Sequence, residues 1–158
     1  MLSNLITDRT SEDVQRFLLL RDKGVDNMTA SELEEWNGGL KGAYNISDLN
    51  RVGAALNYVK DRLTDAGYLG GNEFAMRTDW NTGDIVTGKD FAEYLGAVAS
   101  VRNAMTQYNT TPPAPENIGS LDFQDANDIE KILIDIDKLI TLMLASRYYM
   151  GELYSGEI

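Results

Sequence analysis

The segment 79–90 carries oxygen-bearing side chains at a spacing that resembles a calcium-binding loop. Asp79, Asn81 and Asp90 stand at the first, third and twelfth positions, where such a loop supplies ligands. The sixth position, however, lacks the glycine that the sharp turn requires, and the twelfth is not the longer glutamate. Asp90 is also explained as the acid of a capping box with Thr87 at a helix start. We therefore interpret the segment as a plain ordered loop and assign no metal ligand, with calcium binding as the alternative.

Paired carboxylates at Glu34/Glu35 and at Asp135/Asp137 are the residues nearest to an acid and base for glycoside hydrolysis. Close neighbours on a helix do not face each other across a substrate, so we expect these side chains on solvated helix faces. The sequence contains neither histidine nor cysteine. It therefore lacks the side chain that titrates near neutral pH and the thiolate that serves as nucleophile or metal ligand. We expect a protein that is not an enzyme, with no catalytic residue and no cofactor.

The charge balance argues against several kinds of partner. The chain has 25 acidic and 14 basic side chains and a formal net charge of −11 at pH 7, which repels nucleic-acid phosphate and anionic lipid. The first residues lack the basic and apolar regions of a secretion signal, and no stretch approaches the roughly 18 apolar residues of a membrane span. We expect neither nucleic acid nor membrane as a partner.

Apolar residues recur at helical spacing in four segments of the chain, and cap and turn residues mark a fifth, shorter helix. Thr29 and Glu32 have the form of a capping box, and Ser47 and Thr87 are expected caps of two later helices. Steps of three and four between apolar residues mark the longer helices as amphipathic. The expected helices are 11–23, a two-turn helix from the cap at Thr29 to Gly38, 47–66, 87–108 and 123–149.

The remaining segments complete the expected architecture. A long irregular loop covers 67–86, and the proline-containing segment 110–115 is expected to be extended. We predict an all-α fold, a helical bundle of three long and two short helices, with one domain over 1–149 and an extended C-terminal arm over 150–158. The polar side of the last helix is expected to face water, and its members are Asp128, Glu130, Lys131, Asp135 and Lys138.

Large apolar and aromatic side chains near the C-terminus suit a protein interface, because aromatic anchors dominate many interfaces. Trp80 in the long loop has the same character, although packing into the core explains most aromatic residues equally well. The candidate interface residues are Tyr148, Tyr149, Leu153, Tyr154, Ile158 and Trp80.

A series of ordered landmarks spans nearly the whole chain and is rich in turn and cap residues. The landmarks are Thr7-Asp8-Arg9-Thr10, Met28-Thr29 through Glu35-Trp36, Leu40 through Val52, Thr78-Asp79-Trp80, Ala126-Asn127-Asp128-Ile129-Glu130 and Ser155-Gly156-Glu157. In this pattern the chain resembles a module of tail, baseplate or fibre-associated proteins of phages and prophages of Gram-positive bacteria. The pattern contains no catalytic signature, so the resemblance implies a structural role and assigns no site residue.

The resemblance and the absence of histidine and cysteine from the sequence together lead to one functional expectation. The chain is expected to be a virion structural protein that contacts other virion proteins, with a homo-oligomer as a further option, and to be assembled in the bacterial host cytoplasm. Two alternatives stay open. One is an acidic inhibitor that mimics DNA, which requires carboxylates gathered in one elongated patch. The other is a calcium-binding or carbohydrate-binding module built on the loop that contains Trp80.

Overall fold

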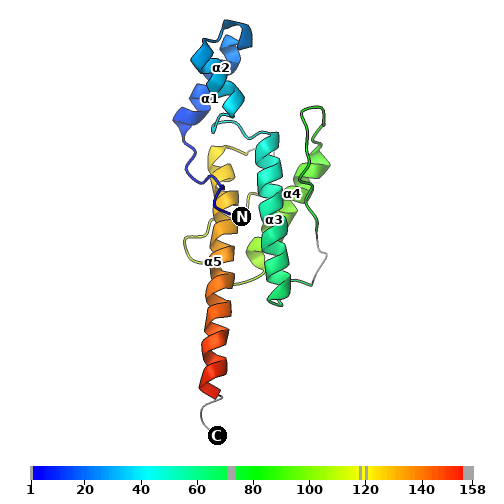
Figure 1. The fold of residues 1–158 in the computed structure, drawn as a ribbon. Helices are drawn as coiled ribbons and strands as arrows, with labels where there is room; N and C mark the ends of the chain where they lie inside the picture. The colour runs from blue at the N-terminus through cyan, green and yellow to red at the C-terminus, as the bar shows by residue number, and fades with distance from the viewer. Residues whose placement is uncertain (1, 71–73, 118, 120, 155–158) are drawn as a thin grey trace.

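The chain folds into helices throughout the part that the structure describes. The computed structural model describes residues 2–70, 74–117, 119 and 121–154, with the side chains of the last helix described as far as Arg147. Within these ranges there are five α-helices, one 3-10 turn and no strand, which confirms the predicted all-α bundle. The elements, drawn in Figure 1, are α1 (Ser11–Lys23), η1 (Val25–Asn27), α2 (Ala30–Gly38), α3 (Ile46–Asp65), α4 (Gly88–Asn103) and α5 (Phe123–Tyr154).

Capping boxes define the starts of the first four α-helices. The predicted caps at Thr29 and Thr87 are confirmed, and Thr10 caps α1 in the same way. The predicted cap at Ser47 is wrong, because Asn45 occupies that position and its side chain accepts from the backbone of Ser47 (2.9 Å) and Asp48 (3.3 Å). Each box satisfies backbone donors that a helix start otherwise leaves unpaired.

Two helix ends differ from the prediction. Helix α4 ends at Asn103 and not at 108, because the Gln107 side chain folds back and donates to the carbonyl groups of Arg102 and Met105. Helix α5 continues to Tyr154, so residues 150–154 of the predicted extended arm are helical. A single glycine such as Gly151 costs a helix only about 1 kcal/mol relative to alanine, too little to end it. Residues 155–158 of the predicted arm lie outside the described residues.

Helices α3, α4 and α5 pack against one another in pairs and enclose the main core. Burial of each large apolar side chain contributes about 1.5–3 kcal/mol before entropy is subtracted, so this core is the main source of stability. The three-four spacing predicted for the long helices is the spacing of the buried positions. The fully buried large apolar residues on these helices are Val52, Leu56, Val59, Leu63, Val98, Val101, Ile132, Leu133, Ile136 and Ile140.

Helices α1 and α2 form a small hairpin beyond one end of the bundle (Figure 1). The rings of Phe17 and Trp36 stack between the two helices at 5.8 Å, and Arg16 pairs with Glu35 at 2.6 Å. Gly42 follows the hairpin and lies directly against α1, where an added Cβ would fall 2.0 Å from the carbonyl oxygen of Asp13. Only glycine fits this contact, so Gly42 allows the segment 39–45, between α2 and α3, to lie directly against the hairpin.

Helix α5 extends past the opposite end of the bundle (Figure 1). It has 32 residues, whereas α3 has 20, which corresponds to about 48 Å against about 30 Å. Among its described side chains, which end at Arg147, the last fully buried one is Ile140, and Leu142 and Leu144 are 60% and 40% exposed. The Arg147 guanidinium donates to the carbonyl oxygen of Ala66, just beyond the end of α3. Residues 141–154 therefore form a helical extension, and its described side chains, 141–147, are covered only in part by the rest of the chain.

Candidate functional site

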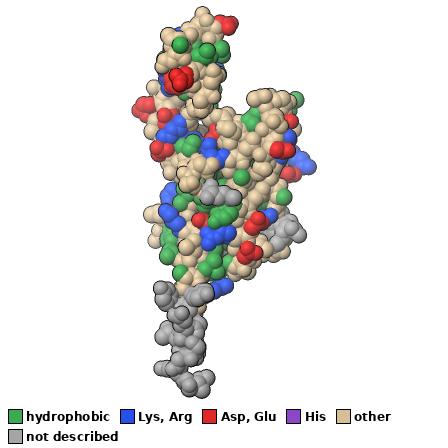
Figure 2. Space-filling view, viewed as in Figure 1, with side chains coloured by type: hydrophobic (Ala, Val, Ile, Leu, Met, Phe, Trp, Pro, Cys, Tyr) green, Lys and Arg blue, Asp and Glu red, His purple; other side chains and the backbone are tan. Residues whose placement is uncertain are grey.

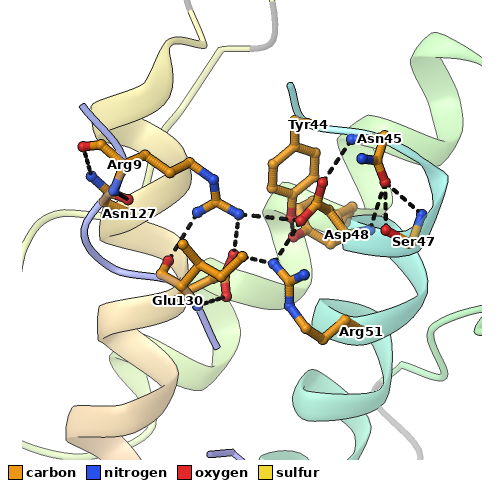
Figure 3. A network of polar contacts seen from close by, with 10 residues as sticks. Arg9, Tyr44, Asn45, Ser47, Asp48, Arg51, Asn127 and Glu130 are labelled. Atoms are coloured by element: carbon orange, nitrogen blue, oxygen red, sulfur yellow. Dashed lines mark hydrogen bonds and ion pairs between the residues drawn. The ribbon is translucent and has the colours of Figure 1, made fainter. Parts of the chain in front are cut away.

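A closed network of two arginines and two carboxylates lies inside the bundle (Figure 3). Glu130 on α5 is fully buried, and Arg9 from the N-terminal segment is 4% exposed. The Glu130 Oε1 atom accepts from Arg9 (2.7 Å) and Arg51 (2.8 Å), and the Asp48 Oδ1 atom accepts from the same two arginines (3.2 and 2.6 Å). The two positive and two negative charges cancel, which is the condition under which buried charges are tolerated.

The same residues tie the N-terminal segment to the bundle. The Asn127 amide donates to the Arg9 carbonyl oxygen (2.9 Å) and accepts from the Arg9 backbone N–H (3.0 Å). The Ile6 N–H donates to Glu130 (2.5 Å), and the Arg9 guanidinium donates back to the Ile6 carbonyl oxygen (2.9 Å). Asp48 in turn accepts from the Asn45 N–H (2.9 Å) as the acid of the α3 capping box. One polar cluster therefore fixes the N-terminal segment, the start of α3 and the first half of α5.

The prediction that the polar side of α5 faces water is wrong for two residues. Glu130 lies one turn after Ala126 and one turn before Leu133, both buried, and this register places it on the core side. Asp135 is also buried and accepts from the Thr111 hydroxyl (2.9 Å) and from Lys131 (2.7 Å), so it holds the segment that follows α4.

The other predicted polar residues of α5, and the paired glutamates of α2, are at least partly exposed to solvent. Asp128 and Lys131 are half-buried, and Lys138 is exposed. Asp137, predicted to be solvated, is half-buried and pairs with Arg62 of α3. Glu34 and Glu35 are exposed, as predicted, although Glu35 pairs with Arg16. The structure brings no two of the paired carboxylates face to face across a cavity.

The segment 74–80 runs along α3 and is held there through its own backbone. The Asn57 amide donates to the Met76 carbonyl oxygen and accepts from the Met76 N–H, both at 2.8 Å. Asn50, two turns earlier, makes the same pair of bonds with the backbone of Trp80 (2.9 and 2.8 Å). Between them stands Gly53, where an added Cβ would fall 2.8 Å from the Arg77 carbonyl oxygen. These α3 residues therefore form a binding face for an extended segment.

The loop 79–90 directs its carboxylates to protein donors and not to a common centre. Arg77 pairs with Asp79 and with Asp84, each at 2.7 Å, and its hydrogen bond lowers the pKa of Asp79. The Thr87 hydroxyl and N–H both donate to Asp90, and the hydroxyl bond lowers the pKa of that carboxyl. Within the described ranges no group of three or more acidic side chains is placed to hold a metal ion.

The predicted interface residues divide into two groups. Trp80 is half-buried, with the Arg77 guanidinium 4.3 Å from the centre of its ring, so it helps to anchor the loop on α3. The backbone of residues 148–154 belongs to α5. The side chains of the C-terminal candidates lie outside the described side chains, and these candidates are Tyr148, Tyr149, Leu153, Tyr154 and Ile158.

Opposite charges are mixed on the face of the molecule that Figure 2 shows. On the face that Figure 2 presents, acidic and basic side chains alternate over the bundle and form no continuous acidic band. Exposed or half-buried ion pairs occur along the described chain, for example between Lys41 and Asp8 (2.8 Å) and between Lys23 and Glu32 (2.5 Å). None of the helices in the described ranges is both long enough and apolar enough to cross a membrane.

The geometry defines an all-α protein whose buried charged groups hold segments of its own chain together. Sequence reasoning missed this network, although Glu130 sits one turn from two core positions and Arg9 lies in the first of the ordered landmarks. No protein-family model, curated protein or solved structure matches the sequence.

Proposed function

We propose that this chain is a non-enzymatic structural or assembly protein of a phage tail, baseplate or tail-fibre region that acts through protein–protein contacts. The observation that carries the proposal is the helical extension of α5, residues 141–154, which projects beyond the bundle (Figure 1). Leu142 and Leu144 are 60% and 40% exposed there. A partner that covers these exposed leucines would remove apolar surface from water and so stabilise the contact.

The buried polar groups add support for a role without chemistry. Every carboxylate of the Arg9 network has its partners inside the protein, and the carboxylates of the loop 79–90 are bound by Arg77 and by a helix cap. Four of the ordered landmarks contribute residues to the network or to the attachment of the loop, namely Arg9, Asp48, Trp80 and Glu130. Landmarks that hold a fold together are what a structural module requires.

The two alternative functions receive less support. An inhibitor that mimics DNA requires a continuous acidic surface, whereas opposite charges are mixed on the face in Figure 2. A calcium or carbohydrate site in the loop requires free carboxylates or an exposed Trp80 ring, whereas Arg77 binds Asp79 and lies over the ring.

The test is incorporation into particles. Phage particles assembled in cells that express the chain are purified on a density gradient, and the chain is quantified by mass spectrometry. We expect the wild-type chain at a fixed ratio to the tail proteins, and Leu142→Glu/Leu144→Glu at a much lower ratio. The matched control, Val25→Glu/Ile85→Glu, adds the same charge at two other exposed apolar positions and should be incorporated normally.

The outcomes separate the parts of the proposal. Absence of the wild-type chain from the particles would contradict a virion role. Equal incorporation of both double variants would contradict the α5 extension as the contact surface. Thermal melts of the purified variants must match the wild type, because all four positions are exposed and their replacement should leave the fold intact.

A further inference from the structure

A cavity of about 570 Å³ lies where the N-terminal segment, the start of α4 and the start of α5 meet. Its volume falls within the range of sites that bind small molecules in proteins, and its position between helices of a bundle is common for such sites. Apolar walls come from Phe91, Leu121 and Phe123, and polar groups come from Arg9, Tyr44 and Tyr94. The ion network shares only Arg9 with the cavity wall, and Asp48, Arg51 and Glu130 do not line it.

Two donors that belong to residues lining the cavity have no acceptor among the described groups. The hydroxyl groups of Tyr44 and Tyr94 are hydrogen-bonded to each other, and Tyr94 is buried. Two hydroxyls have two protons and their mutual bond uses one, so one O–H remains to donate. The Nε atom of Arg9 is likewise buried without a hydrogen-bond partner among the described groups. A buried donor without an acceptor is unfavourable, so an acceptor supplied from the cavity would be stabilising.

The surrounding charges favour a neutral ligand over an anion. Arg9 is already neutralised by Glu130 (2.7 Å) and Asp48 (3.2 Å), so its charge is not available to a bound carboxylate or phosphate. Asp122, also on the wall, adds a negative charge. Burial raises the pKa of both Tyr44 and Tyr94, so their hydroxyl groups stay protonated and remain donors near neutral pH.

We propose that this cavity binds a neutral, largely apolar small molecule whose single carbonyl oxygen accepts the free hydroxyl proton of the Tyr44–Tyr94 pair. The aromatic and aliphatic walls bury the body of the ligand, and the tyrosine pair fixes its orientation. This binding site is independent of the role proposed for the α5 extension.

The probe for the test is 6-propionyl-2-(dimethylamino)naphthalene, a neutral fluorescent ketone, titrated into the full-length protein. We expect saturable binding to one site and an emission shift to shorter wavelength. The double variant Tyr44→Phe/Tyr94→Phe keeps both rings and removes both hydroxyls, so the affinity for the ketone should fall by about three- to tenfold, the effect of one hydrogen bond. Tyr58→Phe/Tyr108→Phe, outside the cavity, is the matched control and should leave the affinity unchanged.

A probe without a carbonyl group tests the role of the hydrogen bond, and variants that fill the cavity test where the probes bind. 2-(Dimethylamino)naphthalene lacks the carbonyl group, and its affinity should be the same for the wild type and Tyr44→Phe/Tyr94→Phe. Ala126→Phe, on the α5 wall, or Val14→Phe, on the α1 wall, should block both probes while thermal melts report whether each variant is folded. The proposal is overturned by lack of saturable binding, by ketone binding that survives in a folded cavity-filling variant, or by an unchanged ketone affinity without the two hydroxyls.

Discussion

Replacement of Glu130 by alanine should destabilise the protein more than any single exposed acidic substitution. Glu130 is fully buried and accepts three hydrogen bonds, from the Ile6 N–H (2.5 Å), Arg9 (2.7 Å) and Arg51 (2.8 Å). In the variant Glu130→Ala, the two arginines keep only Asp48 as a charged partner, and the Ile6 N–H loses its acceptor. The network then carries one unbalanced buried positive charge.

The expected magnitude follows from these losses. Removal of one partner from a buried ion pair costs about 3–5 kcal/mol, mainly because the other charge remains buried without compensation. For a chain of 158 residues each kcal/mol lowers the melting temperature by about 2–4 °C, so Glu130→Ala should melt roughly 6–20 °C below the wild type. Glu34→Ala, at an exposed position on α2, is the matched control and should change stability by about 0.5 kcal/mol or less.

The assays are thermal and urea unfolding followed by circular dichroism, together with hydrogen exchange of the Ile6 amide. A double-mutant cycle with Arg9→Ala should show coupling, since the two side chains share one hydrogen-bond network. If Glu130→Ala unfolds at the same urea concentration as Glu34→Ala, and the Ile6 amide keeps its protection, the buried network does not hold the N-terminal segment.

Three further predictions concern packing, loop attachment and pH. Gly42→Ala should detach the α1–α2 hairpin, because its Cβ would fall 2.0 Å from a backbone oxygen, whereas Gly96→Ala, with nothing within 4 Å, should raise the melting temperature of the protein. Asn57→Ala should cost about 1–3 kcal/mol and make the segment 74–80 sensitive to protease; unchanged cleavage would count against the α3 binding face. The hydrogen bond from Lys23, together with the backbone hydrogen bond at the helix cap, lowers the pKa of Glu32 to about 2. The stabilisation that the ionised Glu32 carboxylate gives the folded state is therefore complete above pH 4.5 and is lost as the pH falls toward 2. In an NMR titration Lys23→Ala should raise that pKa toward 4.5, and an unmoved value would refute the assignment.

The helices were predictable from sequence because their signals are local. Capping boxes such as Thr29 with Glu32 need only four consecutive residues, and amphipathic spacing is visible within one helix. The end of α4 was not predictable, because Gln107 reaches back to carbonyl groups from beyond the apolar pattern.

The buried network was not predictable because its partners are distant in sequence. Arg9 and Glu130 are 121 residues apart, and no local pattern shows that an arginine from the N-terminal segment will neutralise a glutamate on the last helix. In the absence of that partner, a glutamate beside an apolar stripe is normally assigned to the solvated face. Attachment of the loop to α3 was not predictable either. Asn50 and Asn57 bind backbone groups, which every residue has, so the sequence does not show which segment they will hold.

The α5 extension is the feature on which the proposed role in assembly depends. Among the side chains of α5 described as far as Arg147, the last fully buried one is Ile140, and the exposed Leu142 and Leu144 follow it. Amides of residues 129–140, inside the bundle, should therefore exchange slowly with solvent, and amides of 141–154 should exchange quickly in the free protein.

Hydrogen–deuterium exchange of the extension, measured by mass spectrometry in the free chain and in purified particles, tests the account most directly. We expect the amides of 141–154 to become as protected in the particles as those of 129–140, because a neighbouring protein covers the helix. Rapid exchange of 141–154 in both states would contradict the assembly role of this helix.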